Sequence, residues 1–156
     1  MAIHRISDDF YDHSYILIAI HCALEDYRLA YFLNARLHAK FKRLPDIDLY
    51  QNHVAFSVYE WEDHKTGSVW NLLSNTSKSG IVAVKNSPTL FGDDTASKSV
   101  YLIPERKQTD YFLKIDGESI REDLLNLLHK INEIPQIVTA YSVAPDQLKS
   151  KHNLII

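Results

Sequence analysis

The feature that most constrains the fold is a regular alternation of side chains over residues 53–62. In an extended chain, Val54, Phe56 and Val58 face one side, and the residues between them face the other. This pattern predicts a half-buried strand. The polar stretch 64–67 ends at Gly67, which can adopt a positive φ, and residues 68–73 then return as a second strand. The middle of the chain therefore predicts an antiparallel hairpin.

Two other segments have apolar residues at helical spacing, which predicts helices over 24–41 and 119–131. The first stripe consists of Leu29, Phe32, Leu33 and Leu37, and the second of Ile120, Leu124, Leu127, Leu128 and Ile131. We interpret Lys40, Lys42 and Arg43 as the positively charged C-terminal end of the first helix. Pro45 then prevents the helix from continuing.

Further strands are predicted at 13–20, 99–103, 110–115 and 137–143, with a short uncertain one at 81–84. The resulting order, β-α-β-β-(β)-β-β-α-β, predicts an α+β fold in which two helices pack on a largely antiparallel sheet. The two strands 99–103 and 110–115 are expected to pair as a hairpin. Residues 110–143 form a β-α-β unit, so we expect a ferredoxin-like element in the C-terminal half.

All 156 residues are expected to form a single domain, because this length is typical of one hydrophobic core. Residues 1–12 and 145–156 are expected to be loosely ordered. Residues 86–99 are rich in polar and turn-forming types and are predicted to form a long loop.

Composition excludes several classes of function. The formal net charge of −3 argues against binding to nucleic acid, which needs many cations on one face. The four glycines are far apart, so no phosphate-binding loop is present. The single cysteine and the scattered histidines predict neither a metal site nor a cofactor. The longest apolar run, residues 15–20, is too short to span a membrane, and without a signal peptide we expect a cytoplasmic protein.

Cys22 has two interpretations. A thiol near a helix start beside His21 can be an activated nucleophile. However, adjacent residues in an extended segment point in opposite directions, and Glu25 and Asp26 would oppose a thiolate. We favour a small buried residue over a catalytic one.

Residues 103–111 read Ile-Pro-Glu-Arg-Lys-Gln-Thr-Asp-Tyr. This segment resembles the signature of the bacterial IPExxxVDY family, with the motif positions Ile103, Pro104, Glu105, Asp110 and Tyr111. Thr109 stands where the family has valine. Segments 24–31 and 70–72 also resemble stretches of sequence found in this family. The resemblance implies a small cytoplasmic protein of Bacteroidetes-type bacteria. It transfers no reaction, cofactor or catalytic residue.

The signature itself allows a structural and a binding interpretation. Pro104 lacks an N–H and ends strand pairing. Glu105 and Asp110 can then hold backbone donors in place or pair with Arg106 and Lys107. We favour the structural interpretation, and a binding role stays open.

Aromatic residues provide the remaining functional signal. Tyr27 and Tyr31 lie one helical turn apart beside Arg28, and Tyr59 and Trp61 share one strand face. Tyr, Trp and Arg are the residue types that anchor protein interfaces. We therefore favour a non-catalytic interaction module that binds another protein or a second copy of itself. The candidate interaction residues are Glu25, Asp26, Tyr27, Arg28, Tyr31, Tyr59, Trp61, Glu105, Asp110 and Tyr111.

The alternative is a small-molecule-binding protein or a small enzyme. Its polar pocket would form between the sheet and the loop 86–99, lined by Glu105, Asp110, Tyr111 and, from the first helix, Glu25 and Arg28. An enzyme is the less favoured interpretation, because no catalytic constellation is recognisable in the sequence.

Overall fold

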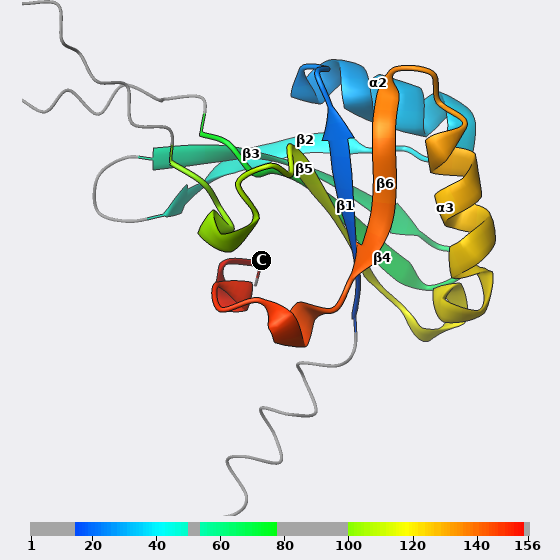
Figure 1. Ribbon diagram of the computed structural model, residues 1–156. Helices are drawn as coiled ribbons and strands as arrows, with labels where there is room; N and C mark the ends of the chain where they lie inside the picture. The colour runs from blue at the N-terminus through cyan, green and yellow to red at the C-terminus, as the bar shows by residue number, and fades with distance from the viewer. Residues whose placement is uncertain (1–14, 50–53, 78–99, 155–156) are drawn as a thin grey trace, which may run out of the picture.

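The computed structural model describes residues 15–49, 54–77 and 100–154 (Figure 1). These residues form an α+β fold built on a six-stranded antiparallel sheet, in the order β2-β3-β4-β5-β1-β6. The strands are β1 (Tyr15–Cys22), β2 (Lys42–Leu49), β3 (Val54–Asp63), β4 (Ser68–Ser74), β5 (Tyr111–Asp116) and β6 (Ile137–Val143). The helices are α2 (Asp26–Leu37) and α3 (Leu124–Asn132), with short 3₁₀ turns η1 (Pro104–Arg106), η2 (Glu118–Asp123), η3 (Pro145–Gln147) and η4 (Lys151–Leu154).

The predicted hairpin is confirmed as β3 and β4, joined by a turn in which Gly67 has a φ of 66°. The predicted β-α-β unit is confirmed as β5, α3 and β6. β1 lies between the two strands of this unit and pairs antiparallel with both. This split β-α-β arrangement is the one found in ferredoxin-like folds.

The sheet is buried on both faces, which explains why β1 is apolar along almost its whole length. On one face, Ile18 packs in a core with Leu33 of α2 and Ile131 of α3. On the other face, Phe56 and Phe112 belong to a second core. The short 3₁₀ turns and the segments beside them cover this second face, through Leu102, Ile103, Leu148 and Leu154.

The first helix ends earlier than predicted. α2 stops at Leu37, and His38 follows in the left-handed conformation with a φ of 54°. The Asn34 side chain accepts a hydrogen bond from the Phe41 N–H at 2.8 Å, which holds the chain as it leaves the helix. The predicted continuation to residue 41 is therefore wrong.

The basic cluster consequently belongs to a strand that the sequence did not predict. Lys42 and Arg43 lie in β2, which pairs with β3 and forms one edge of the sheet. Pro45 falls where the register shifts between Leu44 and Ile47. An edge strand tolerates proline at such an irregularity, because the missing N–H is not needed for pairing.

The predicted strand 99–103 is also wrong for the described residues 100–103. Only Tyr101 makes a strand-like contact, as an isolated bridge to Thr76. β5 pairs with β4 and β1 instead of with this segment. Residues 104–106 form a 3₁₀ turn that begins at Pro104, a position where its missing donor costs nothing.

The C-terminal segment is not loose over residues 145–154, in contrast to the prediction. Leu148 and Leu154 are buried in the second core beneath the turns η3 and η4. Asn153 donates a hydrogen bond to the Leu102 carbonyl at 2.8 Å. The predicted lead-in 1–12, the short strand 81–84 and the loop 86–99 lie outside the described residues.

Candidate functional site

Asp110 and Tyr111 of the signature hold the connection between β1 and α2. The Cys22 N–H donates to Asp110 Oδ2 at 2.9 Å, and the Tyr111 hydroxyl donates to the Leu24 carbonyl at 2.6 Å. Burial raises the pKa of Tyr111, and nearby Cys22 and acidic side chains raise it further. Both side chains therefore have a structural role at this connection.

Asn75 holds the signature segment from the other side. This residue is completely buried at the end of β4. Its side chain accepts from the Ile103 N–H at 2.8 Å and donates to the Arg106 and Thr109 carbonyls, each at 2.8 Å. These hydrogen bonds satisfy backbone groups of Ile103, Arg106 and Thr109 that would otherwise pair with a neighbouring strand. This is why the signature segment does not need to form a strand.

Glu105 connects the signature with the C-terminal segment. Its carboxylate accepts from the Ser150 N–H at 2.7 Å and from the Ser150 hydroxyl at 3.0 Å. Burial alone would raise the pKa of Glu105, but these hydrogen bonds outweigh it and lower the pKa below its ordinary value. The three polar signature side chains thus have identifiable structural roles.

Cys22 is a free cysteine and is buried. Burial raises the pKa of the Cys22 thiol, a neighbouring backbone hydrogen bond at Leu24 lowers it, and the charge of Asp110 raises it again. A thiol with a raised pKa is a poor nucleophile near neutral pH. His21 bonds instead to the Tyr141 hydroxyl at 2.9 Å, with the two rings stacked.

A cavity of about 330 Å³ does lie beside the signature. It is lined by His21, Pro104, Glu105, Arg106, Lys107, Gln108, Thr109 and Tyr141. Glu105 is the one residue of the predicted pocket that lines it. Asp110 and Tyr111 bond instead to the β1–α2 connection. The predicted pocket itself was to be closed by the loop 86–99, which lies outside the described residues.

The start of α2 contains an ion pair between a buried carboxylate and an exposed arginine. Asp26 is only 3% exposed, and its Oδ2 accepts from Arg43 of β2 at 3.0 Å. The Arg43 guanidinium also lies over the Tyr59 ring at 5.4 Å and pairs with Asp46. Tyr59 is 7% exposed, so neither it nor Asp26 presents a side chain on the free surface.

The exposed part of α2 matches the predicted interaction residues more closely. Tyr27 and Tyr31 are 58% and 68% exposed, and Arg28 and Glu25 are exposed beside them. A hydrogen bond with Glu25 raises the pKa of Tyr27. We call Tyr27, Arg28 and Tyr31 the α2 surface. The Tyr31 ring contacts Phe32, with ring centroids 5.6 Å apart.

Phe32 in turn lines an open groove of about 610 Å³ between the C-terminal ends of the two helices. The groove is lined by Phe32, Ala35, Arg36, Glu133, Ile134, Pro135 and Gln136. Arg36 forms an ion pair with Glu133 across it. The α2 surface and this groove are therefore joined through the Tyr31–Phe32 contact.

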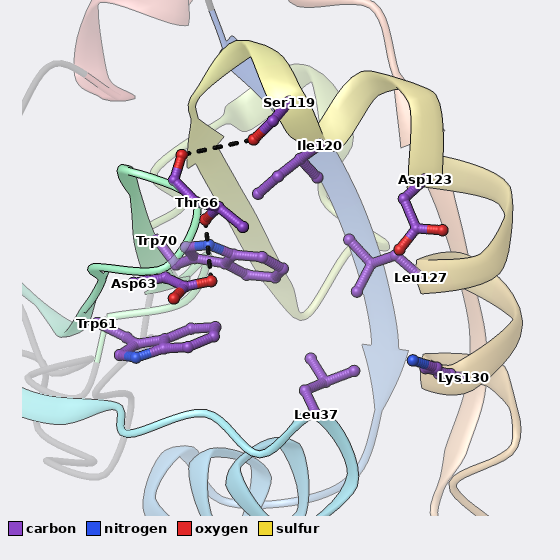
Figure 2. Close-up of a pocket in the computed structure, with 10 residues that line it drawn as sticks. All are labelled: Leu37, Trp61, Asp63, Thr66, Trp70, Ser119, Ile120, Asp123, Leu127 and Lys130. Atoms are coloured by element: carbon purple, nitrogen blue, oxygen red, sulfur yellow. Dashed lines mark hydrogen bonds between the residues drawn. The ribbon is translucent and has the colours of Figure 1, made fainter.

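Trp61 lies in a separate cavity of about 240 Å³, which we call the tryptophan pocket (Figure 2). It is lined by Leu37, Trp61, Asp63, Thr66, Trp70, Ser119, Ile120, Asp123, Leu127 and Lys130. Trp61 and Trp70 are paired across β3 and β4, with ring centroids 5.0 Å apart. Trp70 is only 5% exposed and donates from Nε1 to the Ser68 hydroxyl, whereas Trp61 is half-buried.

Charged groups surround the apolar part of the tryptophan pocket. Asp63 is held in place by Lys65 N–H and the Thr66 hydroxyl, at 3.0 and 2.9 Å. Asp123 occupies the N-cap position of α3 but makes no capping hydrogen bond, and its carboxylate lies at the pocket wall with Lys130 (Figure 2). A second cavity of about 330 Å³ shares Leu37, Trp61 and Asp63 with this pocket.

Comparison with known proteins gives no assignment. No family model matches the chain, and no similar curated protein or solved structure was found. None of the helices in the described ranges is long and apolar enough to cross a membrane. Over the same residues, His, Cys, Asp and Glu side chains do not gather in any group of three that could hold a metal ion.

The sequence did not identify Asn75, Arg43 or Asp123 as important residues. Asn75 lies in a polar stretch that is typical of an ordinary turn, and Arg43 was assigned to a helix end. Only a correct prediction of β2 could have placed Arg43 near Asp26. Asp123 had a signal, because an acidic residue before an apolar helix is expected to be a cap.

Proposed function

We propose that this protein is a non-catalytic interaction module that binds a protein partner through the α2 surface. The observation that carries the proposal is the exposure of Tyr27 and Tyr31 around Arg28 on a helix whose opposite side is fixed in the core. Rigid aromatic side chains lose little conformational entropy on binding, and a neighbouring arginine adds directional hydrogen bonds.

The groove beside α2 supports the same proposal. It provides a concave apolar area next to the Tyr31–Phe32 contact, into which a side chain of the partner can insert. The alternative, a small-molecule-binding protein or a small enzyme with a pocket at the signature, has less support. Asp110 and Tyr111 are engaged within the fold, and Glu105 holds the C-terminal segment.

The family and the location remain part of this proposal. We infer that the chain is a cytoplasmic protein of the bacterial IPExxxVDY family, on the basis of Ile103, Pro104, Glu105, Asp110 and Tyr111.

The test is affinity purification of the wild type and of a triple variant with Tyr27→Ala, Arg28→Ala and Tyr31→Ala. We expect a partner that co-purifies with the wild type to be lost from the variant, because each anchor contributes about 2 kcal/mol or more. Sedimentation of both proteins separates a second copy from a different partner. A double variant, Leu125→Ala with Val138→Ala, removes exposed apolar groups elsewhere and should retain the partner. Equal recovery by the triple variant would contradict the proposal.

A further inference from the structure

The tryptophan pocket has the chemistry of a ligand site that is separate from the α2 surface. Its apolar lining comes from two helices and the β3–β4 hairpin, with Leu37, Ile120 and Leu127 facing the two indole rings (Figure 2). A dry cavity of about 150 Å³ is enough to hold a benzene ring. The volume of about 240 Å³ therefore accommodates one aromatic ring with a short substituent.

The charge of that substituent follows from the lining. Indole faces attract cations more strongly than other aromatic side chains do. The pocket adds two carboxylates, Asp63 and Asp123, against one ammonium group from Lys130. Asp63 is fixed by its own hydrogen bonds, and Asp123 is not engaged in capping α3. A ligand that packs against the half-buried Trp61 can thus direct its cationic group toward Asp123 on the α3 side of the pocket, while Asp63 adds a second negative charge on the hairpin side (Figure 2).

We propose that the tryptophan pocket binds a small organic ammonium ion that carries an aromatic ring. The ring packs against Trp61 and the apolar wall formed by Ile120 and Leu127. The ammonium group lies toward Asp123, which is on the opposite side of the Trp70 ring from Asp63 (Figure 2). Lys130 weakens this binding, so its removal strengthens the complex.

The chain provides its own reporter for the test. Trp61 and Trp70 are its two tryptophans, and both line the pocket, so intrinsic tryptophan fluorescence reports on this site. The probes are benzylammonium, benzyl alcohol and benzoate, which share a ring and differ in charge. Titrations at constant ionic strength should show that benzylammonium binds most tightly and benzoate least tightly.

Two matched variants test the assigned charges. Asp123→Asn should weaken benzylammonium binding about three- to tenfold, and Lys130→Gln should strengthen it about two- to threefold. Both positions are exposed, so the variants should fold, and circular dichroism checks this. In each variant, the affinity for benzyl alcohol should stay unchanged.

Three results would overturn the proposal. The first is that none of the probes changes the fluorescence or the indole N–H signals in NMR spectra. The second is that benzyl alcohol or benzoate binds as tightly as benzylammonium, which would indicate a purely apolar site. The third is that the two charge variants leave benzylammonium binding unchanged.

Discussion

The side-chain amide of Asn132 pairs with the backbone of Ala140 in the way that a neighbouring strand would. Its Oδ1 accepts from the Ala140 N–H and its Nδ2 donates to the Ala140 carbonyl, each at 2.9 Å. Ala140 lies in β6, the edge strand on the opposite side of the sheet from β2. The last turn of α3 thus occupies hydrogen-bonding groups that an edge strand would otherwise expose.

Asn132→Ala should therefore destabilise the protein and free the edge of β6. We expect a loss of about 1–2 kcal/mol in the free energy of unfolding, since two backbone groups lose their partner. We also expect concentration-dependent association, because β6 from Ile137 to Val143 contains no charged residue to oppose strand pairing. Urea denaturation and sedimentation measure the two effects. Asn126→Ala, at an exposed position in the same helix, should show neither.

Asn75→Ala should be among the most destabilising single changes at a polar position. It leaves the Ile103 N–H and the Arg106 and Thr109 carbonyls without their side-chain partner in a buried region. We expect a loss of about 2–4 kcal/mol, measured by urea denaturation. Asn75→Asp keeps an acceptor for the Ile103 N–H, but it places a negatively charged carboxylate against the carbonyls of Arg106 and Thr109. This variant should therefore be as unstable as the alanine variant. A loss below 1 kcal/mol in the alanine variant would show that the segment does not depend on Asn75.

Arg43→Met should cost more than its exposed position suggests. The change removes the ion pair with Asp26, whose carboxylate is buried, and the contact with the Tyr59 ring. Because Arg43 is 41% exposed, we expect the free energy of unfolding to fall by about 1–3 kcal/mol. Breaking a fully buried ion pair would cost more. Thermal denaturation measures the change. Lys42→Met, at the exposed neighbouring position, should be nearly neutral, and equal effects of both changes would argue against a specific role for Arg43.

Acid should release the C-terminal segment through Glu105. The pKa of Glu105 is lowered in the folded protein, so its ionised form favours the bound segment above the unfolded pKa of about 4.3. This contribution is lost as the pH falls through the lowered folded pKa. Hydrogen exchange at the Ser150 amide should therefore show falling protection in this acidic range, after correction for intrinsic exchange. In Glu105→Gln, protection should be weaker at neutral pH and should lack this acid-dependent step.

The sequence predicted the parts of the fold that depend on local periodicity. The β3–β4 hairpin, β6 and the presence of both helices follow from the spacing of apolar side chains. Residues 119–123 of the second predicted helix instead form part of the 3₁₀ turn η2, and α3 begins at Leu124. β2 was missed because an edge strand with one solvated side carries charges and a proline, which are typical of a helix end or a loop. The early end of α2 depends on the bond between Asn34 and Phe41, which no periodicity reveals.

The candidate site was predictable to a similar extent. Tyr27 and Tyr31 were selected as interaction candidates from their spacing beside Arg28, and the structure shows both side chains exposed. Tyr59 is buried because β2 and Arg43 cover it, and the sequence did not predict either contact. The tryptophan pocket brings together a hairpin and the ends of two helices, which requires knowledge of how these elements pack.

The position of β1 between β5 and β6 also affects how the protein can be made. During synthesis, β1 leaves the ribosome first among the described strands, yet both of its neighbours, β5 and β6, come from the last third of the chain. The apolar residues of β1 therefore lack their native partner strands while the region from α2 to β4 is translated. Proteins dominated by such long-range pairing fold slowly and expose aggregation-prone surface meanwhile. We expect nascent chains that stop before β5 to depend on chaperones, and full-length chains to be released from them.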